Sequence, residues 1–292
     1  MTESALRLVW IYPDLLSTYG DRGNALVVER RARQRGIAVT RIDVSSDQAI
    51  PTGGDIYLVG GGEDRPQRLA AQRLLADGGL TKAARNGAII FAVCAGFQIV
   101  GSEFVDDLGQ RQPGLGLLDV WSTRHGGSRC VGDVLATADD ALGIPQLTGF
   151  ENHQGVTHLG PGVRQLATVQ VGRGNGTDDR SEGAWQGRIF GTYLHGPVMA
   201  RNPAMADKLI QLAIHADELP PADAVWFDAL RAERISATPV PRDRDTRRGG
   251  VEARARTRTQ RDPRDHHSDG PRQPRPADPM QPTMIRSSFR HR

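Results

Sequence analysis

One cysteine of this sequence lies where a short apolar run gives way to very small residues. The run AIIFAV (88–93) has the composition of a buried strand, and Cys94 follows it directly. Small residues two positions before and after a nucleophile, here Ala92 and Gly96, relieve crowding in a sharp strand-to-helix turn. A helix starting there would favour a thiolate through its dipole, and the N–H of Ala95 would face an oxyanion. Cys94 is therefore a candidate nucleophile, although most free cysteines are simply small buried residues.

A glycine cluster supplies a second feature that favours catalysis. The strand-like run DIYLVGGG (55–62) ends in three glycines, which is more than a plain turn needs. Because glycine lets backbone N–H groups approach a substrate closely, we expect a second oxyanion donor around Gly61.

A thiol nucleophile also needs a base, and His195 is the candidate that the sequence favours. His195 lies in IFGTYLHGP, directly after a strand-like run, so it could meet a strand-end cysteine across the edge of a sheet. His153 and His125 are the alternatives. His153 and His158 are five residues apart, but no cysteine or carboxylate accompanies them, and we predict no metal site.

The first hundred residues alternate between continuous apolar runs and helical patterns. We expect strands over 6–12, 37–44, 55–62 and 88–93, and helices over 23–36, 65–76 and 81–86. This alternation predicts an α/β fold with a mostly parallel sheet and helices on both of its faces. Ligands bind such sheets beyond the carboxyl ends of the strands, which is where Cys94 falls.

The second half of the sequence differs in composition and in its strand pattern. Residues 114–194 are rich in glycine, with short strand candidates at 117–123, 129–136, 164–171 and 188–194. A helix is expected over 202–216, with Asn202 as its N-cap and Pro203 in its first turn. We expect one folded domain over residues 1–237 and a disordered tail rich in Arg and Pro over 238–292.

Charge and cysteine content exclude several classes of protein. Residues 242–292 hold 14 arginines against seven acidic residues, so a whole-chain charge of +3 leaves the remainder near −4. A mildly acidic folded part argues against nucleic-acid binding. Two cysteines are too few for a disulfide framework, and neither a signal peptide nor a transmembrane segment is recognisable, so the sequence predicts a cytoplasmic protein.

Four of these segments together resemble a known family. GGGED, AVCAGFQIVG, GFENHQG and TYLHG, in this order, are similar to the class I glutamine amidotransferases of the cobyric-acid-synthase-like branch. The opening segment YPDLLSTYGDRGN narrows the resemblance to the glutaminase subunits of lipid II isoglutaminyl synthase, whose partner is the Mur-ligase-like MurT. The resemblance covers roughly residues 6–235, and it implies a class I amidotransferase fold of the flavodoxin-like type.

The resemblance also implies a reaction. Cys94 would attack the side-chain amide carbon of L-glutamine, and a γ-glutamyl thioester would form as ammonia leaves. His195 would take the thiol proton and deliver it to the ammonia. The N–H groups of Gly61 and Ala95 would hold the oxyanion.

Two further residues match substrate-binding positions of the family. Gln98, one turn along the helix after the nucleophile, would contact the substrate. Arg129 matches an arginine that grips the α-carboxylate of glutamine, a task that suits the guanidinium fork. The alternative for Arg129 is an ordinary surface charge.

One position departs from the pattern of many class I amidotransferases. These enzymes complete a triad with a glutamate two residues after the histidine, and here that residue is Pro197. The cobyric-acid-like branch shares this gap. Either another acidic residue folds in or the partner supplies one, so we expect the isolated chain to hydrolyse glutamine poorly and to be stimulated by its partner.

The lysines exclude an ATP-dependent ligase on this chain. There are only two, Lys82 and Lys208, and neither lies in a phosphate-binding Gly-Lys-Ser/Thr context. The resemblance then implies no cofactor here, with ATP and Mg used by the MurT-like ligase, which would amidate the D-glutamate α-carboxyl of lipid II at the inner face of the membrane. The alternatives are a glutaminase for another acceptor, such as a cobalamin precursor, a non-catalytic scaffold, or a free-standing γ-glutamyl hydrolase.

Overall fold

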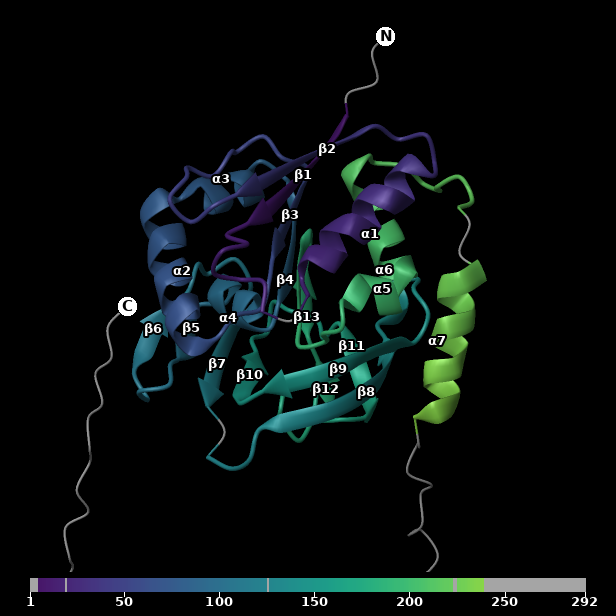
Figure 1. Cartoon of the computed structure of the whole chain (residues 1–292). Helices are drawn as coiled ribbons and strands as arrows, with labels where there is room; N and C mark the ends of the chain where they lie inside the picture. Colours follow the sequence, from purple (N-terminus) through teal and green to yellow (C-terminus); the bar gives the residue numbers. More distant parts are fainter. Residues whose placement is uncertain (1–4, 19, 125, 223–224, 239–292) are drawn as a thin grey trace, which may run out of the picture. The chain divides into compact units, whose positions relative to one another are not determined.

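The computed structural model (Figure 1) describes residues 5–18, 20–124, 126–222 and 225–238 of the chain. Its central sheet has the strand order β13-β14-β4-β3-β1-β2. The strands are β1 (Leu6–Ile11), β2 (Val39–Val44), β3 (Ile56–Val59), β4 (Ile89–Val93), β13 (Ala184–Gln186) and β14 (Ile189–Thr192). All neighbours run parallel except the hairpin pair β13 and β14. The predicted mostly parallel α/β sheet is thus confirmed.

Helices cover both faces of this sheet (Figure 1). One group consists of α2 (Asp64–Asp77), α3 (Gly79–Arg85) and α4 (Ala95–Val100). The other consists of α1 (Arg22–Arg33), α5 (Val198–Arg201) and α6 (Pro203–Ala213), which contact one another. Because β4 lies between these layers, all five of its residues are buried, which explains why its sequence is continuously apolar.

The start of α6 differs in one detail from the sequence-based expectation. Pro203 does open the helix, but the side chain of Asn202 makes no capping hydrogen bond. Its amide instead accepts from the Thr148 N–H at 2.9 Å and donates to the Thr148 carbonyl at 2.7 Å. Asn202 therefore occupies the predicted N-cap position, but its side chain joins the helical layer to a strand and does not cap α6.

The glycine-rich second half forms two smaller sheets. One has the order β10-β7-β5-β6 and the other β12-β11-β8-β9. Their strands are β5 (Glu103–Val105), β6 (Arg111–Pro113), β7 (Val120–Arg124), β8 (Cys130–Ala138), β9 (Leu147–His153), β10 (Gly155–Leu159), β11 (Ala167–Val171) and β12 (Ser181–Glu182). The expected strands 117–123, 129–136, 164–171 and 188–194 each overlap an observed one, whereas β5, β6, β9, β10 and β12 were not expected.

A 3-10 turn (Asp140–Leu142) and α7 (Val225–Ala237) complete the described elements, and α7 contacts α5 and β9. The predicted disordered tail, residues 238–292, lies outside the described residues except for Thr238. Among the helices that the structure describes, none is long and apolar enough to cross a bilayer.

Candidate active site

Cys94 sits in the sharp turn between β4 and α4. Its backbone has φ 52° and ψ −105°, a conformation that a non-glycine residue rarely adopts and that costs roughly 1–3 kcal/mol. The turn leaves no room for a side chain at Gly96, because a Cβ there would lie 2.5 Å from the Val59 carbonyl oxygen. The small residues around the cysteine are therefore a steric requirement of the turn, as the sequence indicated.

The strands on either side of β4 bring the other two predicted features to Cys94. β3, which leads into the glycine cluster, and β14, which leads to His195, both pair with β4 in parallel. The main chain of His195 is fixed by two hydrogen bonds with Phe150, of 2.8 and 3.2 Å. A Cβ built on Gly61 would lie 3.1 Å from His195 Cε1 and 3.6 Å from Cys94 Cβ, so the three residues meet at one point.

Both reactive side chains are removed from water. Cys94 is 7% exposed and His195 is 3% exposed. Burial raises the pKa of Cys94 to about 12, helped by the negative charge of Asp21 and opposed by a hydrogen bond from the Ala95 N–H and the charge of Arg129. Burial lowers the pKa of His195 to about 4, with a further contribution from His153. At neutral pH the pair is a thiol and a neutral imidazole, and that imidazole can accept a proton.

The glycine cluster is arranged differently from the sequence-based expectation. The N–H of Gly61 donates to the buried carboxylate of Asp21 at 3.0 Å. The glycine that lines the pocket beside Cys94 and Ala95 is the next one, Gly62. The role of Gly61 as an oxyanion donor stays a prediction, and Gly62 is a competing donor.

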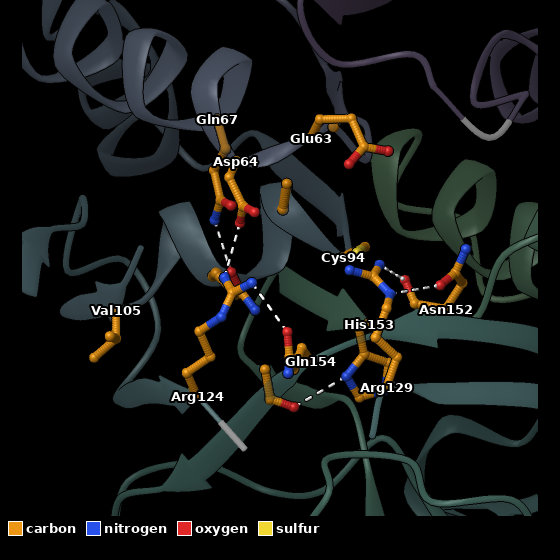
Figure 2. A pocket seen from close by; sticks show the side chains of 14 residues that line it. Glu63, Asp64, Gln67, Cys94, Val105, Arg124, Arg129, Asn152, His153 and Gln154 are labelled. Atoms are coloured by element: carbon orange, nitrogen blue, oxygen red, sulfur yellow. Dashed lines mark hydrogen bonds and ion pairs between the residues drawn. The ribbon is translucent and has the colours of Figure 1, made fainter. Parts of the chain in front are cut away.

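A pocket opens in front of Cys94, and Figure 2 shows its side chains. Arg129 lies on its wall, exposed, with Nε donating to Asn152 Oδ1 at 3.1 Å and Nη2 to the Asn152 carbonyl at 3.2 Å. Gln98 also lines the pocket, but its amide is engaged: Oε1 accepts from Gln67 at 2.7 Å and Nε2 donates to the Tyr193 hydroxyl at 2.9 Å. Arg129 thus keeps further donors of its fork for a ligand, while Gln98 would have to exchange partners.

Sequence reasoning did not single out a second arginine of the pocket. Arg124, at the end of β7, donates to Asp64 at 3.0 Å and to Gln154 at 3.0 Å, which joins two sides of the pocket (Figure 2). His153 also lines the pocket and stacks on Tyr193 with ring centroids 3.8 Å apart. The segment GFENHQG contained the signal for His153 and Gln154, whereas nothing in the sequence around Arg124 distinguished it.

One buried carboxylate supports the strand end that carries His195. Glu182 is fully buried and accepts from the Thr192 hydroxyl and, at 3.1 Å, from the Tyr193 N–H. Burial raises the pKa of Glu182 to about 7, and the charge of Glu151 adds to this increase. In the part of the chain that the structure describes, no group of three or more His, Cys, Asp or Glu could hold a metal ion.

Comparison with known proteins identifies the family. A model of the CobB/CobQ-like glutamine amidotransferase domain matches residues 7–203. The "Lipid II isoglutaminyl synthase (glutamine-hydrolyzing) subunit GatD" of Streptococcus pneumoniae is 34% identical over 212 residues, covering 72% of this chain and 80% of the relative. The protein of the same name from Staphylococcus aureus is 33% identical over 209 residues, covering 71% of this chain and 84% of that relative.

A more distant relative differs in length. The "Probable cobyric acid synthase" of Methanoregula boonei is 32% identical over 184 residues, but the match covers 58% of this chain and only 36% of that protein. The site geometry, the family model and the two subunits lead to one conclusion. The chain belongs to the CobB/CobQ-like glutamine amidotransferase family, in the group of glutamine-hydrolysing GatD subunits.

Proposed function

We propose that this chain is the glutaminase subunit of a lipid II isoglutaminyl synthase. It hydrolyses L-glutamine and supplies ammonia to a separate ligase. The observation that carries the proposal is the convergence of Cys94, His195 and the glycine cluster at the carboxyl ends of three adjacent strands. The similarity of this chain to two GatD subunits, over at least 80% of their length, also supports the proposal.

The reaction follows from the two buried side chains. The sulfur of Cys94 attacks the amide carbon of glutamine while His195 accepts the thiol proton, and the amide oxygen becomes an oxyanion. Collapse of this intermediate expels the amide nitrogen, which leaves as ammonia with the proton held by His195. Water then cleaves the γ-glutamyl thioester, releases glutamate and restores the thiol.

Backbone N–H groups stabilise the oxyanion in this proposal. The N–H of Ala95 already hydrogen-bonds the sulfur of Cys94 and follows the nucleophile directly. The second donor comes from the glycine cluster, as Gly61 or as Gly62, which faces the pocket. Arg129 takes the α-carboxylate of glutamine, since its side chain lines the same pocket and is exposed to an incoming ligand.

The ligase partner performs the second half of the reaction. We propose a MurT-like Mur ligase that uses ATP and Mg to activate the D-glutamate α-carboxyl of lipid II at the inner face of the membrane. Ammonia from Cys94 converts this carboxyl to D-isoglutamine. Pro197 occupies the position of the usual triad glutamate. The partner is therefore expected to stimulate glutamine hydrolysis, by supplying an acid or by ordering the site.

The test uses the full chain with and without its ligase. Ammonia release from glutamine and amidation of lipid II are measured for the parent and for Cys94→Ala. We expect the substitution to reduce both by roughly 10⁴-fold or more, because the nucleophile is lost. Amidation of a cobalamin precursor but not of lipid II would contradict the proposed acceptor. Failure of a glutamine-like electrophile to label Cys94 would contradict the catalytic role.

A further inference from the structure

Asp21 is a buried acid that the reaction described above does not use. It occupies the N-cap position of α1, where an aspartate usually accepts the N–H of the helix's first turn. Its side chain makes no capping hydrogen bond and is 4% exposed. The carboxylate instead accepts the N–H of Gly61 at 3.0 Å. A buried carboxylate is costly unless it is hydrogen-bonded, so its contact with the glycine cluster needs a reason.

The peptide between Gly60 and Gly61 is held at both of its ends. Its carbonyl oxygen accepts the N–H of Gly96, in the first turn of the nucleophile helix, at 3.1 Å. Its N–H donates to Asp21. Because a peptide unit is planar and rigid, two such bonds fix its orientation relative to Cys94.

The next peptide unit then determines which N–H faces the substrate. The Gly61 carbonyl accepts the N–H of Thr18 at 3.3 Å. This peptide is trans, so the N–H of Gly62 points away from Thr18. Gly62 lines the pocket together with Ala95. An N–H of Gly62 that points away from Thr18 and lies beside Ala95 is thus a candidate donor to the oxyanion.

The glycine cluster cannot fix itself by side-chain packing. A Cβ on Gly60 would lie 2.2 Å from the Leu16 carbonyl oxygen and 2.9 Å from Asp21 Cγ, so a larger residue does not fit. Consecutive glycines have wide backbone freedom, and an unrestrained peptide could rotate its N–H out of the site. An external hydrogen bond is therefore needed to keep the donor in place.

We propose that Asp21 is a positioning residue for glutamine hydrolysis, which holds the glycine cluster so that the Gly62 N–H joins the Ala95 N–H in binding the oxyanion. The inference rests on the proposed glutaminase function. The negative charge of Asp21 works against the nucleophile, because it raises the pKa of Cys94. The hydrogen bond to Gly61, and not the charge, is thus the useful property of this side chain.

Three variants of the full chain in complex with its ligase separate these effects. Asp21→Asn keeps an acceptor and removes the charge. Asp21→Ser is one bond shorter, and serine is itself a good N-cap for α1. Asp14→Asn is the matched control, since Asp14 lies in the same loop but binds the Ser46 N–H at 3.0 Å.

Two rates are measured for each variant. Glutamine hydrolysis needs the oxyanion donors, whereas alkylation of Cys94 by iodoacetamide displaces iodide and forms no oxyanion. We expect Asp21→Ser to lower kcat about 10²-fold, the effect of losing one donor, with KM within a few-fold and alkylation not slowed. Asp21→Asn should recover kcat to within about tenfold of the parent, and Asp14→Asn should stay within about threefold.

Several outcomes would overturn the inference. One is an Asp21→Ser variant with parental kcat, and another is one whose alkylation slows as much as hydrolysis. A third is Asp21→Asn as impaired as Asp21→Ser, which would assign the role to the charge. If thermal unfolding shows that neither Asp21→Ser nor Asp21→Asn folds, Asp21 serves folding and the inference is wrong. A parent complex that releases no ammonia from glutamine would instead overturn the proposed function.

Discussion

The candidate active site has two walls that are built in opposite ways, a buried wall with Cys94 and His195 and an exposed wall with Arg129. Cys94 and His195 lie at the ends of neighbouring parallel strands, and both are buried. Arg129 lies beyond the end of β7, on an exposed segment, and is held by side-chain contacts to Asn152. Figure 2 shows Arg124 and Arg129 among the side chains that line the pocket. The groups proposed to exchange protons are buried and held by the backbone, whereas the group proposed to bind a charged ligand is exposed.

Burial also gives the two walls different charge states. The buried wall holds a neutral thiol and a neutral imidazole, because a low dielectric disfavours the charged form of each. A guanidinium on the exposed wall keeps its charge in contact with water. In the proposed function, the exposed wall would bind the carboxylate of glutamine and the buried wall its amide, so substitutions on the two walls should change different kinetic constants.

The largest effect on kcat is expected from His195→Asn on the buried wall. Loss of the base should lower kcat by roughly 10²–10⁴-fold with little change in KM. The pKa of His195 is lowered to about 4, so its proton-accepting form persists well below pH 6.5. In the parent, the acid limb of kcat/KM should then fall below pH 6.5, toward pH 4. An acid limb at or above pH 6.5 would contradict the burial argument.

The next effect concerns stability, through Glu182→Gln beneath the same wall. The pKa of Glu182 is raised from 4.5 to about 7 in the folded chain, so the unfolded chain loses this proton first as pH rises. Ionised Glu182 then destabilises the fold at pH 8 by about 3 kcal/mol, and by much less at pH 4.5.

Denaturant unfolding at the two pH values measures this difference. Glu182→Gln keeps the acceptor for Thr192 and Tyr193 and removes the charge, so it should raise the free energy of unfolding at pH 8 by up to that amount and change it little at pH 4.5. Exposed Glu218→Gln is the control and should change neither. Equal gains at both pH values would show that packing, and not ionisation, is responsible.

The smallest effect is expected from Arg129→Met on the exposed wall. A hydrogen-bonded ion pair is worth about 1.5 kcal/mol at a site open to water, so KM for glutamine should rise about tenfold while kcat stays within a few-fold. Arg111→Met is the control, because Arg111 is exposed and pairs with Glu103. A fall in kcat without a change in KM would place Arg129 in the chemical step.

The strands of the parallel sheet could be predicted because burial on both faces makes their sequences continuously apolar. Cys94 and its two neighbouring strand ends followed from the same property. The contribution of Asp21 could not be predicted, since it depends on a loop that meets the glycine cluster 40 residues away in the sequence. Which of the three glycines faces the pocket depends on peptide orientation, and the residue types do not reveal that orientation.

Arg124 and the strand β9 show the same limit in the glycine-rich half. β9 is mostly buried, but its sequence LTGFENH has only two large apolar residues, so its composition differs little from that of a loop. Arg124 is distinguished by its partners, Asp64 in α2 and Gln154 between β9 and β10. Side-chain partners of this kind are fixed by packing across the fold and not by local spacing.

The burial of Cys94 has a consequence for chemical durability. Oxidants such as peroxide attack the thiolate and not the thiol, and the resting side chain is almost entirely thiol at neutral pH. The nucleophile is thus a poor substrate for sulfenic acid formation, although it is the most reactive atom that the mechanism requires. In the proposed reaction the thiol loses its proton only when an amide is in place, so the same burial would protect Cys94 from oxidation between turnovers.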